Sequence, residues 1–407
     1  MSTTVILDDA RQLHGQMVQL RHRLHQAPEL GLELPRTQET VLEELADLPL
    51  EITLGTGCTS IGAVLRGTAE LPEGRERPAV LLRADMDALP IQEASGVEFS
   101  SRIDGRMHAC GHDLHTAMLA GAARLLAERR HRLAGDVVFM FQPGEELLAG
   151  APMMIEEGIL DLPGRRVDSA YGLHVFSSGG KNGTFLTRQG IMMSAADALF
   201  VTVVGHGGHG SAPQQAKDPV PVMAEMITAL QTMVTRQFDA HDPVVVSVGM
   251  VKAGEAINVI PDTAKFGASL RMYSPESRAK LQQAVPRLLQ GIASAHGLEV
   301  EVEYLVGGRV LANEQENTDF AIERITQLFG AERHIAMAKP LGGSEDFADV
   351  LAQVPGSFIN LDATALSGDA GEFNHSPRAV FDDSVLGAGT ALYTDLAFSR
   401  LAELSAR

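Results

Sequence analysis

Two short runs of this chain are almost entirely apolar, and polar residues follow each of them. Residues 79–84 read A-V-L-L-R-A, and residues 136–141 read D-V-V-F-M-F. Such runs are typical of strands that are buried on both faces of a sheet. Similar strands are predicted for residues 60–65, 169–173 and 357–361. Helical stretches lie between the strands, so we predict an α/β fold with a mixed, mostly parallel sheet flanked by helices.

Amphipathic stretches supply the predicted helices of this fold. Leucine and methionine recur at helical spacing within residues 9–26, and Pro28 follows as a helix terminator. Residues 37–47 and 117–130 also place apolar side chains on one helical face. We therefore expect two helices before the first strand and a third after residue 116.

The order of the predicted elements changes after about Ser194. From there the pattern is strand, helix, strand, strand, helix, strand, at residues 198–204, 219–238, 244–251, 264–272, 275–296 and 298–305. This βαββαβ order is typical of an α+β domain. Alternating strands and helices return after about Gly307, and 407 residues suit two domains. We predict that residues 194–306 form a domain inserted into a first domain made of residues 1–193 and 307–407.

Residues 107–116 read M-H-A-C-G-H-D-L-H-T and concentrate one thiol and three imidazoles. Cysteine thiolate and neutral histidine are the preferred ligands of zinc-like metals. Cys110 and His112 lie at or just before the N-terminus of the helix predicted at 117–130, where the helix dipole favours a thiolate. A buried structural cysteine beside capping residues is the alternative. Further ligands at other strand ends would favour a metal.

Other chemically versatile side chains follow the predicted strands directly. Asp87, Glu145, Glu146 and His174 each come after a strand, and His375 lies in the loop after residues 357–361. Ligands of α/β folds bind outside the carboxyl ends of the strands. We therefore expect these residues to converge at the edge of the sheet where Cys110 lies.

The adjacent pair Glu145 and Glu146 indicates metal-assisted hydrolysis. Neighbouring side chains point in different directions, so one carboxylate can bind a metal while the other acts as a general base. A solvated acidic turn is the alternative. Asp87 is predicted to orient a metal-binding histidine through its second N–H, and Asp85 to be structural. Residues 344–347 (S-E-D-F) are predicted to cap a helix, with a place in the site as the alternative.

Residues 205–210 read G-H-G-G-H-G and formally match the dinucleotide-binding pattern G-x-G-x-x-G. We reject that interpretation because no helix opens directly after the motif within a βαβ unit. The glycines more simply allow a tight turn that presents His209, with a turn of solvated histidines as the alternative. A serine hydrolase has little support, since the chain has no G-x-S-x-G elbow.

Charge and cysteine content exclude several classes of protein. The chain carries 52 acidic and 33 basic residues, which gives a net charge of −19. A chain this acidic lacks the excess positive charge that binds nucleic acid or an anionic membrane. Two cysteines, Cys58 and Cys110, exclude a disulfide framework and fit a reducing cytoplasm. The first ten residues do not read as a signal peptide, and no apolar run is long enough to span a membrane.

The chain also resembles a known family in a set of motifs that runs along nearly its whole length. These are H-Q-A-P-E-L-G (25–31), R-A-D-M-D-A-L-P-I-Q-E (83–93), M-H-A-C-G-H-D-L-H-T (107–116), Q-P-G-E-E (142–146), G-L-H-V (172–175), G-G-H-G-S-A-P (207–213), D-P (218–219), I-N-V-I-P-D (257–262), G-G-S-E-D-F (342–347) and N-H-S-P (374–377). The family is that of the M20 metallopeptidases and aminoacylases. The resemblance is to its amidohydrolase branch, which includes hippurate hydrolases, N-acyl-amino-acid amidohydrolases and plant auxin-conjugate hydrolases.

The resemblance implies a zinc-exopeptidase-like catalytic domain with two divalent metal ions. Cys110 would bridge them, with His112 and His174 on one ion and Glu146 and His375 on the other. Glu145 would be the general base. Mixed sulfur, nitrogen and oxygen ligands suit zinc best, with manganese, cobalt or nickel as alternatives. The implied reaction is hydrolysis of the amide bond of N-acyl-amino acids. A dipeptidase or carboxypeptidase is the alternative activity, and a non-catalytic metal-binding relative is a weaker one.

The resemblance also assigns the inserted domain as a lid that mediates a homodimer or a dimer of dimers. His209 would reach the partner's site and stabilise the oxyanion. Asn258 and Arg271 would hold the substrate carboxylate, a role that suits the bidentate guanidinium. Many relatives have lysine at the position of His206 and histidine at that of Gln214. These two departures bear on substrate preference and not on the metal chemistry.

Overall fold

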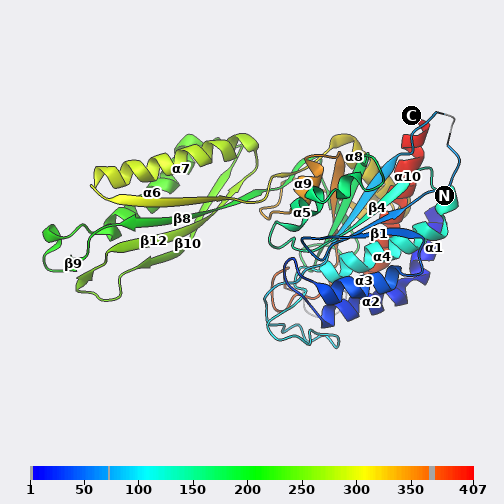
Figure 1. Cartoon of the computed structure of the whole chain (residues 1–407), viewed down its shortest axis with the longest axis horizontal. Helices are drawn as coiled ribbons and strands as arrows, with labels where there is room; N and C mark the ends of the chain where they lie inside the picture. The colour runs from blue at the N-terminus through cyan, green and yellow to red at the C-terminus, as the bar shows by residue number, and fades with distance from the viewer. Residues whose placement is uncertain (1–2, 72–73, 366–371) are drawn as a thin grey trace. The chain divides into compact units, whose positions relative to one another are not determined.

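The computed structural model describes residues 3–71, 74–365 and 372–407. The chain divides into two compact units, which are coloured by residue number in Figure 1. The first unit comprises Met1–Met192, Ala312–Lys339 and Glu345–Arg407. The second comprises Met193–Leu311, together with the short segment Pro340–Ser344.

An eight-stranded mixed sheet forms the centre of the first unit, in the order β1-β2-β4-β3-β5-β16-β6-β15. Its strands are β1 (Leu50–Leu54), β2 (Ile61–Leu65), β3 (Ala79–Asp85), β4 (Asp136–Gln142), β5 (Ser169–Phe176), β6 (Phe185–Thr187), β15 (His334–Ala336) and β16 (Gly356–Asp362). The four central strands β4, β3, β5 and β16 run parallel to one another. Every residue of β3, β4 and β16 is buried, as the apolar runs predicted. The predicted mixed, mostly parallel sheet is confirmed.

Helices pack around this sheet, and their apolar faces complete the core. They are α1 (Thr3–Gln12), α2 (His14–Gln26), α3 (Pro35–Leu45), α4 (His112–Glu128), α5 (Gly150–Glu156), α8 (Gln315–Phe329), α9 (Phe347–Leu351) and α10 (Leu386–Ala406). Single-turn 3₁₀ helices are Arg130–Arg132, Ile159–Asp161, Pro213–Gln215, Ala331–Arg333 and Asp383–Val385. The short strands β7 (Gly190–Met193) and β14 (Leu311–Asn313) pair where the chain passes from one unit to the other. Among the described residues, none of the helices is both long and apolar enough to cross a bilayer.

The single helix predicted for residues 9–26 is wrong, because the chain breaks at Leu13 into α1 and α2. Ile6 of α1 packs in a small cluster with Leu125 and Ala391, whereas Met17 of α2 belongs to the main core. Leu7 and Leu13 contact both clusters, so the two helices share one continuous apolar surface across the break.

The second unit is a four-stranded antiparallel sheet in the order β10-β12-β8-β13, with the long helices α6 and α7 packed against it (Figure 1). Its elements are β8 (Ala195–Val204), β9 (Gly208–His209), α6 (Pro219–Gln237), β10 (Val244–Ala253), β11 (Val259–Ile260), β12 (Thr263–Met272), α7 (Pro275–Ala295) and β13 (Glu299–Val306). Side chains cap both helices at their N-termini. Asp218 accepts a hydrogen bond from the Val220 N–H, and Ser274 accepts one from the Ser277 N–H.

Candidate metal centre

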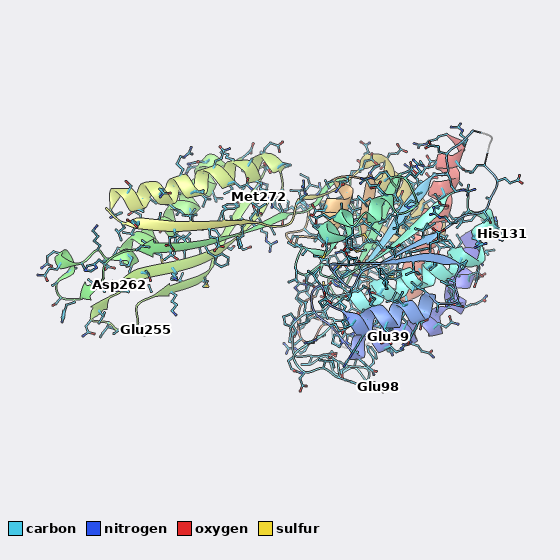
Figure 2. All side chains as sticks on the ribbon, viewed as in Figure 1. Glu39, Glu98, His131, Glu255, Asp262 and Met272 are labelled. Carbon is cyan, nitrogen blue, oxygen red and sulfur yellow. The ribbon has the colours of Figure 1, made fainter. Side chains whose placement is uncertain are left out.

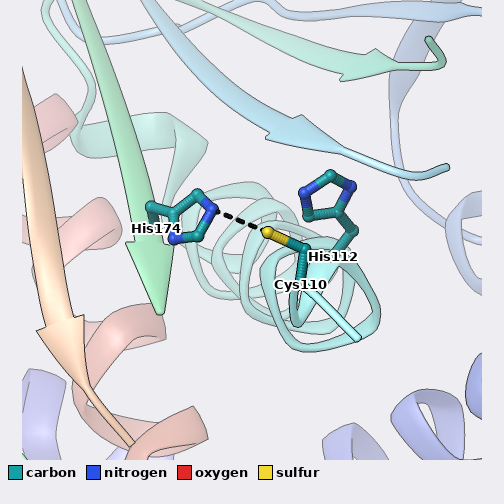
Figure 3. Close-up of side chains that lie close together, drawn as sticks. All are labelled: Cys110, His112 and His174. Carbon is teal, nitrogen blue, oxygen red and sulfur yellow. Dashed lines mark hydrogen bonds between the residues drawn. The ribbon is translucent and has the colours of Figure 1, made fainter. Parts of the chain in front are cut away.

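Cys110 lies just before α4, which begins at His112, at the edge of the sheet where the parallel strands end. The turn into the helix requires Gly111. Its φ of +83° is left-handed, and a Cβ there would lie 2.3 Å from Val175 Cγ2. Figure 3 shows Cys110 pointing toward His174 of β5, with His112 beside them. The Cys110 Sγ lies 3.3 Å from His174 Nε2 and 3.2 Å from His375 Nε2.

Two sets of three donor atoms share this thiol. Cys110, His112 and His174 form one set, and Cys110, Glu146 and His375 form the other, with the atoms of each set within 4.8 Å of one another. The structure thus brings together all five side chains that were predicted as metal ligands. Thiolate, imidazole and carboxylate in these combinations are typical of zinc and related divalent metals.

Several atoms of this cluster are buried without a hydrogen-bond partner. They are His112 Nδ1 and Nε2, His174 Nδ1 and Glu146 Oε1. Leaving a buried polar atom unpaired costs about 1–3 kcal/mol, so native proteins rarely accumulate such atoms without compensation. Burial also lowers the pKa of His174 well below its usual range, which keeps the imidazole in the neutral, metal-binding form. The donor set and its unpaired atoms fit a bound cation.

The loop that carries His375 is held in place by its neighbour Asn374. The Asn374 side-chain amide donates to Val175 O at 2.9 Å and to Cys110 O at 3.3 Å. His375 itself has a left-handed φ of +70°, which is uncommon for a non-glycine residue. The contact with the Cys110 thiol and the nearby Glu146 carboxylate raise the pKa of His375 to about 10, so this pocket favours positive charge beside the thiol.

Glu145 and Glu146 lie in the loop between β4 and α5, and Asp87 holds their backbone. Its two carboxylate oxygens accept hydrogen bonds from the Glu145 and Glu146 N–H groups, both at 3.1 Å. Asp87 Oδ1 also lies 3.4 Å from His112 Nδ1 without meeting the geometry of a hydrogen bond. A carboxylate this close to the ring is in a position to orient a metal-binding histidine. The role of Asp87 in orienting His112 stays a prediction.

The Glu145 carboxyl is buried, and Glu145 Oε2 lies 3.9 Å from His112 Nε2. Burial raises its pKa well above the usual range, and the nearby carboxylates of Glu345 and Glu146 raise it further. The pKa of Glu146 is lowered, since His375 and His112 stabilise its charge. Two adjacent carboxyls with opposite pKa shifts suit two different tasks, one of them proton transfer.

His115 and His108 belong to the same segment but do not join the donor sets around Cys110. His115 Nδ1 contacts Asp85 Oδ1 at 2.5 Å, and its Nε2 accepts the Val175 N–H at 2.8 Å. Both ring nitrogens are therefore engaged in holding β3, α4 and β5 together. His108 is fully buried, and burial lowers its pKa to about 3.

The structure corrects one detail of the predicted site and specifies another. His174 was expected after a strand that ends at residue 173, but β5 continues to Phe176 and His174 lies within it. Residues 344–347 were predicted to cap a helix, and within this segment the Asp346 side chain makes no capping bond to α9. The capping contact comes from its neighbour Glu345, whose side chain accepts the Phe347 N–H at 2.9 Å. Asp346 is fully buried and binds groups far away in the sequence.

His209, Asn258 and Arg271 lie in the second unit. His209 of β9 is close to Asn258, whose carbonyl accepts the Gly210 N–H at 2.8 Å. Arg271 lies near the other end of β12, where its Nη1 donates to Ser344 Oγ at 3.2 Å. Figure 2 labels Asp262, which directly precedes this strand, and Met272, its last residue.

The length of β12 separates the residues predicted to hold the substrate carboxylate. A strand of 10 residues spans about 30 Å at the usual rise of about 3.3 Å per residue. Asn258 and Arg271 of one chain therefore do not meet around one small carboxylate. His209 and Asn258 lie close together near the start of β12, and Arg271 lies near the end of that strand.

Comparison with known proteins identifies the family of this chain. The model of peptidase family M20/M25/M40 matches residues 81–399. The hippurate hydrolase of Campylobacter jejuni is 35% identical over 401 residues, which cover 97% of this chain and 99% of that protein. Thermostable carboxypeptidase 2 of Saccharolobus solfataricus is 33% identical over 394 residues, which cover 96% of each chain.

A solved structure supports the same assignment. The Bacillus subtilis YXEP protein, described as a dinuclear metal-binding peptidase from the M20 family, is 29% identical with a TM-score of 0.80. The match covers 96% of this chain and 99% of that one. The predicted resemblance is confirmed. The chain belongs to peptidase family M20/M25/M40 and is an enzyme that hydrolyses amide bonds.

Proposed function

We propose that this enzyme uses two divalent metal ions to hydrolyse the amide bond of N-acyl-amino acids, releasing a carboxylic acid and an amino acid. The observation that carries the proposal is the pair of donor sets that share Cys110, with the Glu145 carboxyl beside them. The similarity to a hippurate hydrolase supports the choice of substrate class. The similarity to a carboxypeptidase favours peptides as the second candidate.

The metal ligands in this proposal are Cys110, His112, His174, Glu146 and His375. When bound, the two ions would lower the pKa of a water molecule and polarise the substrate carbonyl. Glu145 then accepts the proton of the attacking water and returns it to the leaving amine. Its raised pKa suits a group that must take up a proton and release it within one cycle. Zinc fits the mixed ligands best, with manganese, cobalt or nickel as alternatives.

We further propose a homodimer, or a dimer of dimers, in which each site is completed by the partner's second unit. Within this unit, the Ser211 N–H donates to His209 Nδ1 at 3.1 Å. The neutral ring therefore keeps its proton on Nε2, where it can donate to an oxyanion. The partner's His209 and the partner's Asn258 would meet the substrate opposite Arg271, which explains why one chain keeps them apart.

The two edges of the sheet in the second unit differ in their suitability for pairing with another copy. The edge strand β13 exposes Leu305 and Val306 at its end, but it also carries Glu299, Glu301 and Glu303, and like charges oppose pairing of two such edges. The opposite edge strand, β10, exposes Val245, Met250 and Val251. An exposed apolar edge supports contact between subunits through β10.

The predicted cytoplasmic location also remains part of this proposal.

A substrate panel after metal removal and add-back tests the proposed activity. We expect chelation to abolish release of the free amino acid and divalent metal to restore it, because the five ligands bind the ions that activate the water. N-acyl-amino acids should show a higher kcat/KM than dipeptides with the same C-terminal residue. A preference for the dipeptides would instead support the carboxypeptidase. Turnover that survives complete metal removal would contradict both proposals.

Replacement of Cys110 by alanine should remove metal from both positions, because its thiol belongs to both donor sets. The metal content of the purified variant, measured by elemental analysis, is expected to fall below one ion per chain. Cys58→Ala is the matched control, since Cys58 is also a buried free cysteine but lies outside the donor sets. An unchanged metal content in Cys110→Ala would show that the thiol is no bridge.

A further inference from the structure

The proposed mechanism leaves one buried charged cluster without a role. Its centre is Arg83 of β3, which is fully buried together with Asp85, Glu345 and Asp346. The guanidinium donates to all three carboxylates and to the side chain of Gln142. The distances are 2.6 Å to Asp85 Oδ2, 2.7 Å to Glu345 Oε1, 3.1 Å to Asp346 Oδ1 and 2.8 Å to Gln142 Oε1. Burying this much charge is costly, and apolar residues could fill the same volume.

The cluster adjoins the proposed general base. Carboxylate oxygens of Glu145, Glu345 and Asp346 lie within 4.8 Å of one another. Asp346 does not cap its own helix, as described above. The hydrogen bonds of its side chain instead go to Arg83 and to the two ends of the loop that carries Glu145 and Glu146.

Asp346 binds the start and the end of this loop at the same time. The loop leaves β4 at Gln142 and enters α5 at Gly150. The Gln142 side-chain amide donates to Asp346 Oδ1 at 2.7 Å and to Oδ2 at 2.9 Å. The Ala151 N–H donates to Asp346 Oδ2, also at 2.9 Å. One carboxylate therefore fixes the distance between the two points where the chain enters and leaves the loop.

The loop turns back on itself tightly, and the backbone hydrogen bonds inside it include one from the Leu148 N–H to Glu145 O at 2.7 Å. Leu148 has a left-handed φ of 53°, which is uncommon for a side chain with a Cβ. A Cβ at Gly150 would lie 1.7 Å from Pro143 O, so the chain turns back on itself very tightly. Such a backbone persists only where surrounding groups hold it. Asp87 holds its centre through the Glu145 and Glu146 N–H groups, and Asp346 holds its two ends.

We propose that Asp346 is a positioning residue for amide hydrolysis, which fixes the loop that presents Glu145 and Glu146 and is itself held in place by Arg83. The inference rests on the proposed function, because that function gives the two glutamates their roles. Asp346 acts only through the loop. Loosening the loop should therefore misplace both the base and one metal ligand, while the substrate-binding residues of the second unit stay unchanged.

Asp346→Asn tests this role, because an amide of the same size offers one oxygen acceptor in place of two. We expect kcat to fall about 10- to 100-fold, and one of the two ions to bind about 10- to 100-fold more weakly, which is the usual range for groups that orient metal ligands. KM should change by less than about threefold. Metal binding is measured by titration of the metal-free protein and gives a readout independent of turnover.

Asp136→Asn is the matched control at the opposite end of the same strand, β4. Asp136 is also a buried carboxylate, and it accepts hydrogen bonds from Arg66 Nη1 at 2.8 Å and from the Gly67 N–H at 3.2 Å. Its amide variant should lose a similar amount of thermal stability, yet keep kcat and both metal affinities. Such a result would separate positioning of the loop from general stability of the fold.

If both amide variants keep wild-type kcat and metal affinity, the positioning role of Asp346 is wrong. If Asp346→Asn fails to fold, Gln142→Ala tests the positioning role in its place. This variant removes the contact between Asp346 and the start of the loop, so it should lower kcat and the affinity for the same metal ion. Unchanged values in Gln142→Ala would then overturn the inference.

Glu145→Gln is measured in parallel. If that variant keeps normal turnover, the proposed function fails. If only Glu145→Gln is impaired, the proposed function stands and this inference fails.

Discussion

Glu145→Gln is expected to keep both metal ions and to lose at least about 100-fold in kcat, the usual scale for the loss of a general acid–base group. Glutamine has nearly the same volume as glutamate, so the buried position can be filled without a cavity. It has no basic oxygen that can take a proton from the attacking water. Single-turnover rates and metal content of the same preparation together measure the effect.

Glu146→Gln is the control for this result, because the neighbouring side chain belongs to the donor set with Cys110 and His375. It should weaken metal binding, whereas Glu145→Gln should not. The opposite pKa shifts of the two carboxyls give the physical basis for that difference. Near-normal turnover of Glu145→Gln would remove Glu145 from the mechanism. Loss of metal from Glu145→Gln would make it a ligand instead of a base.

The sequence predicted the sheet and the convergence of the ligands because both follow from local patterns. Continuous apolar runs such as residues 79–84 and 136–141 can be buried only in a sheet that is covered on both faces. Parallel strands end at one edge, so the polar residues that follow them must meet there. The residue at which each strand ends was harder to predict. The strand with His174 runs on to Phe176, because Val175 and its neighbours are also apolar.

The features that escaped prediction depend on contacts between distant parts of the chain. The S-E-D-F segment resembles a helix cap, and nothing next to it in the sequence indicates that Asp346 binds Ala151 and Gln142. The break at Leu13 also escaped prediction, because the helical spacing of the apolar residues gives no sign of it. The sequence signal for Asp346 was its place in the G-G-S-E-D-F motif, which is shared with the family. Its partner Arg83 lies in another shared motif.

The separation of His209 from Arg271 leads to the second large expected effect. His209→Ala should lower kcat by about 10²- to 10³-fold through loss of an oxyanion donor. Glu145→Gln is also expected to be nearly inactive. In a dimer that contains one chain of each kind, the chain with Glu145 intact has a partner with His209 intact. If the partner supplies His209, this mixed dimer contains one complete site.

Two symmetric sites per dimer, one of them complete, should give the isolated mixed dimer about half of the wild-type activity. The two chains are co-expressed with different affinity tags, so that the mixed dimer can be purified away from its inactive parents. A site that used its own chain's His209 would be incomplete in both halves, and the mixed dimer would stay as inactive as the parents. A dimer of Glu145→Gln with a chain that carries both substitutions has no complete site in either arrangement and serves as the control. Recovery in the first dimer but not in the second is expected, because a strand of 10 residues keeps the His209 end of the second unit away from Arg271 of the same chain.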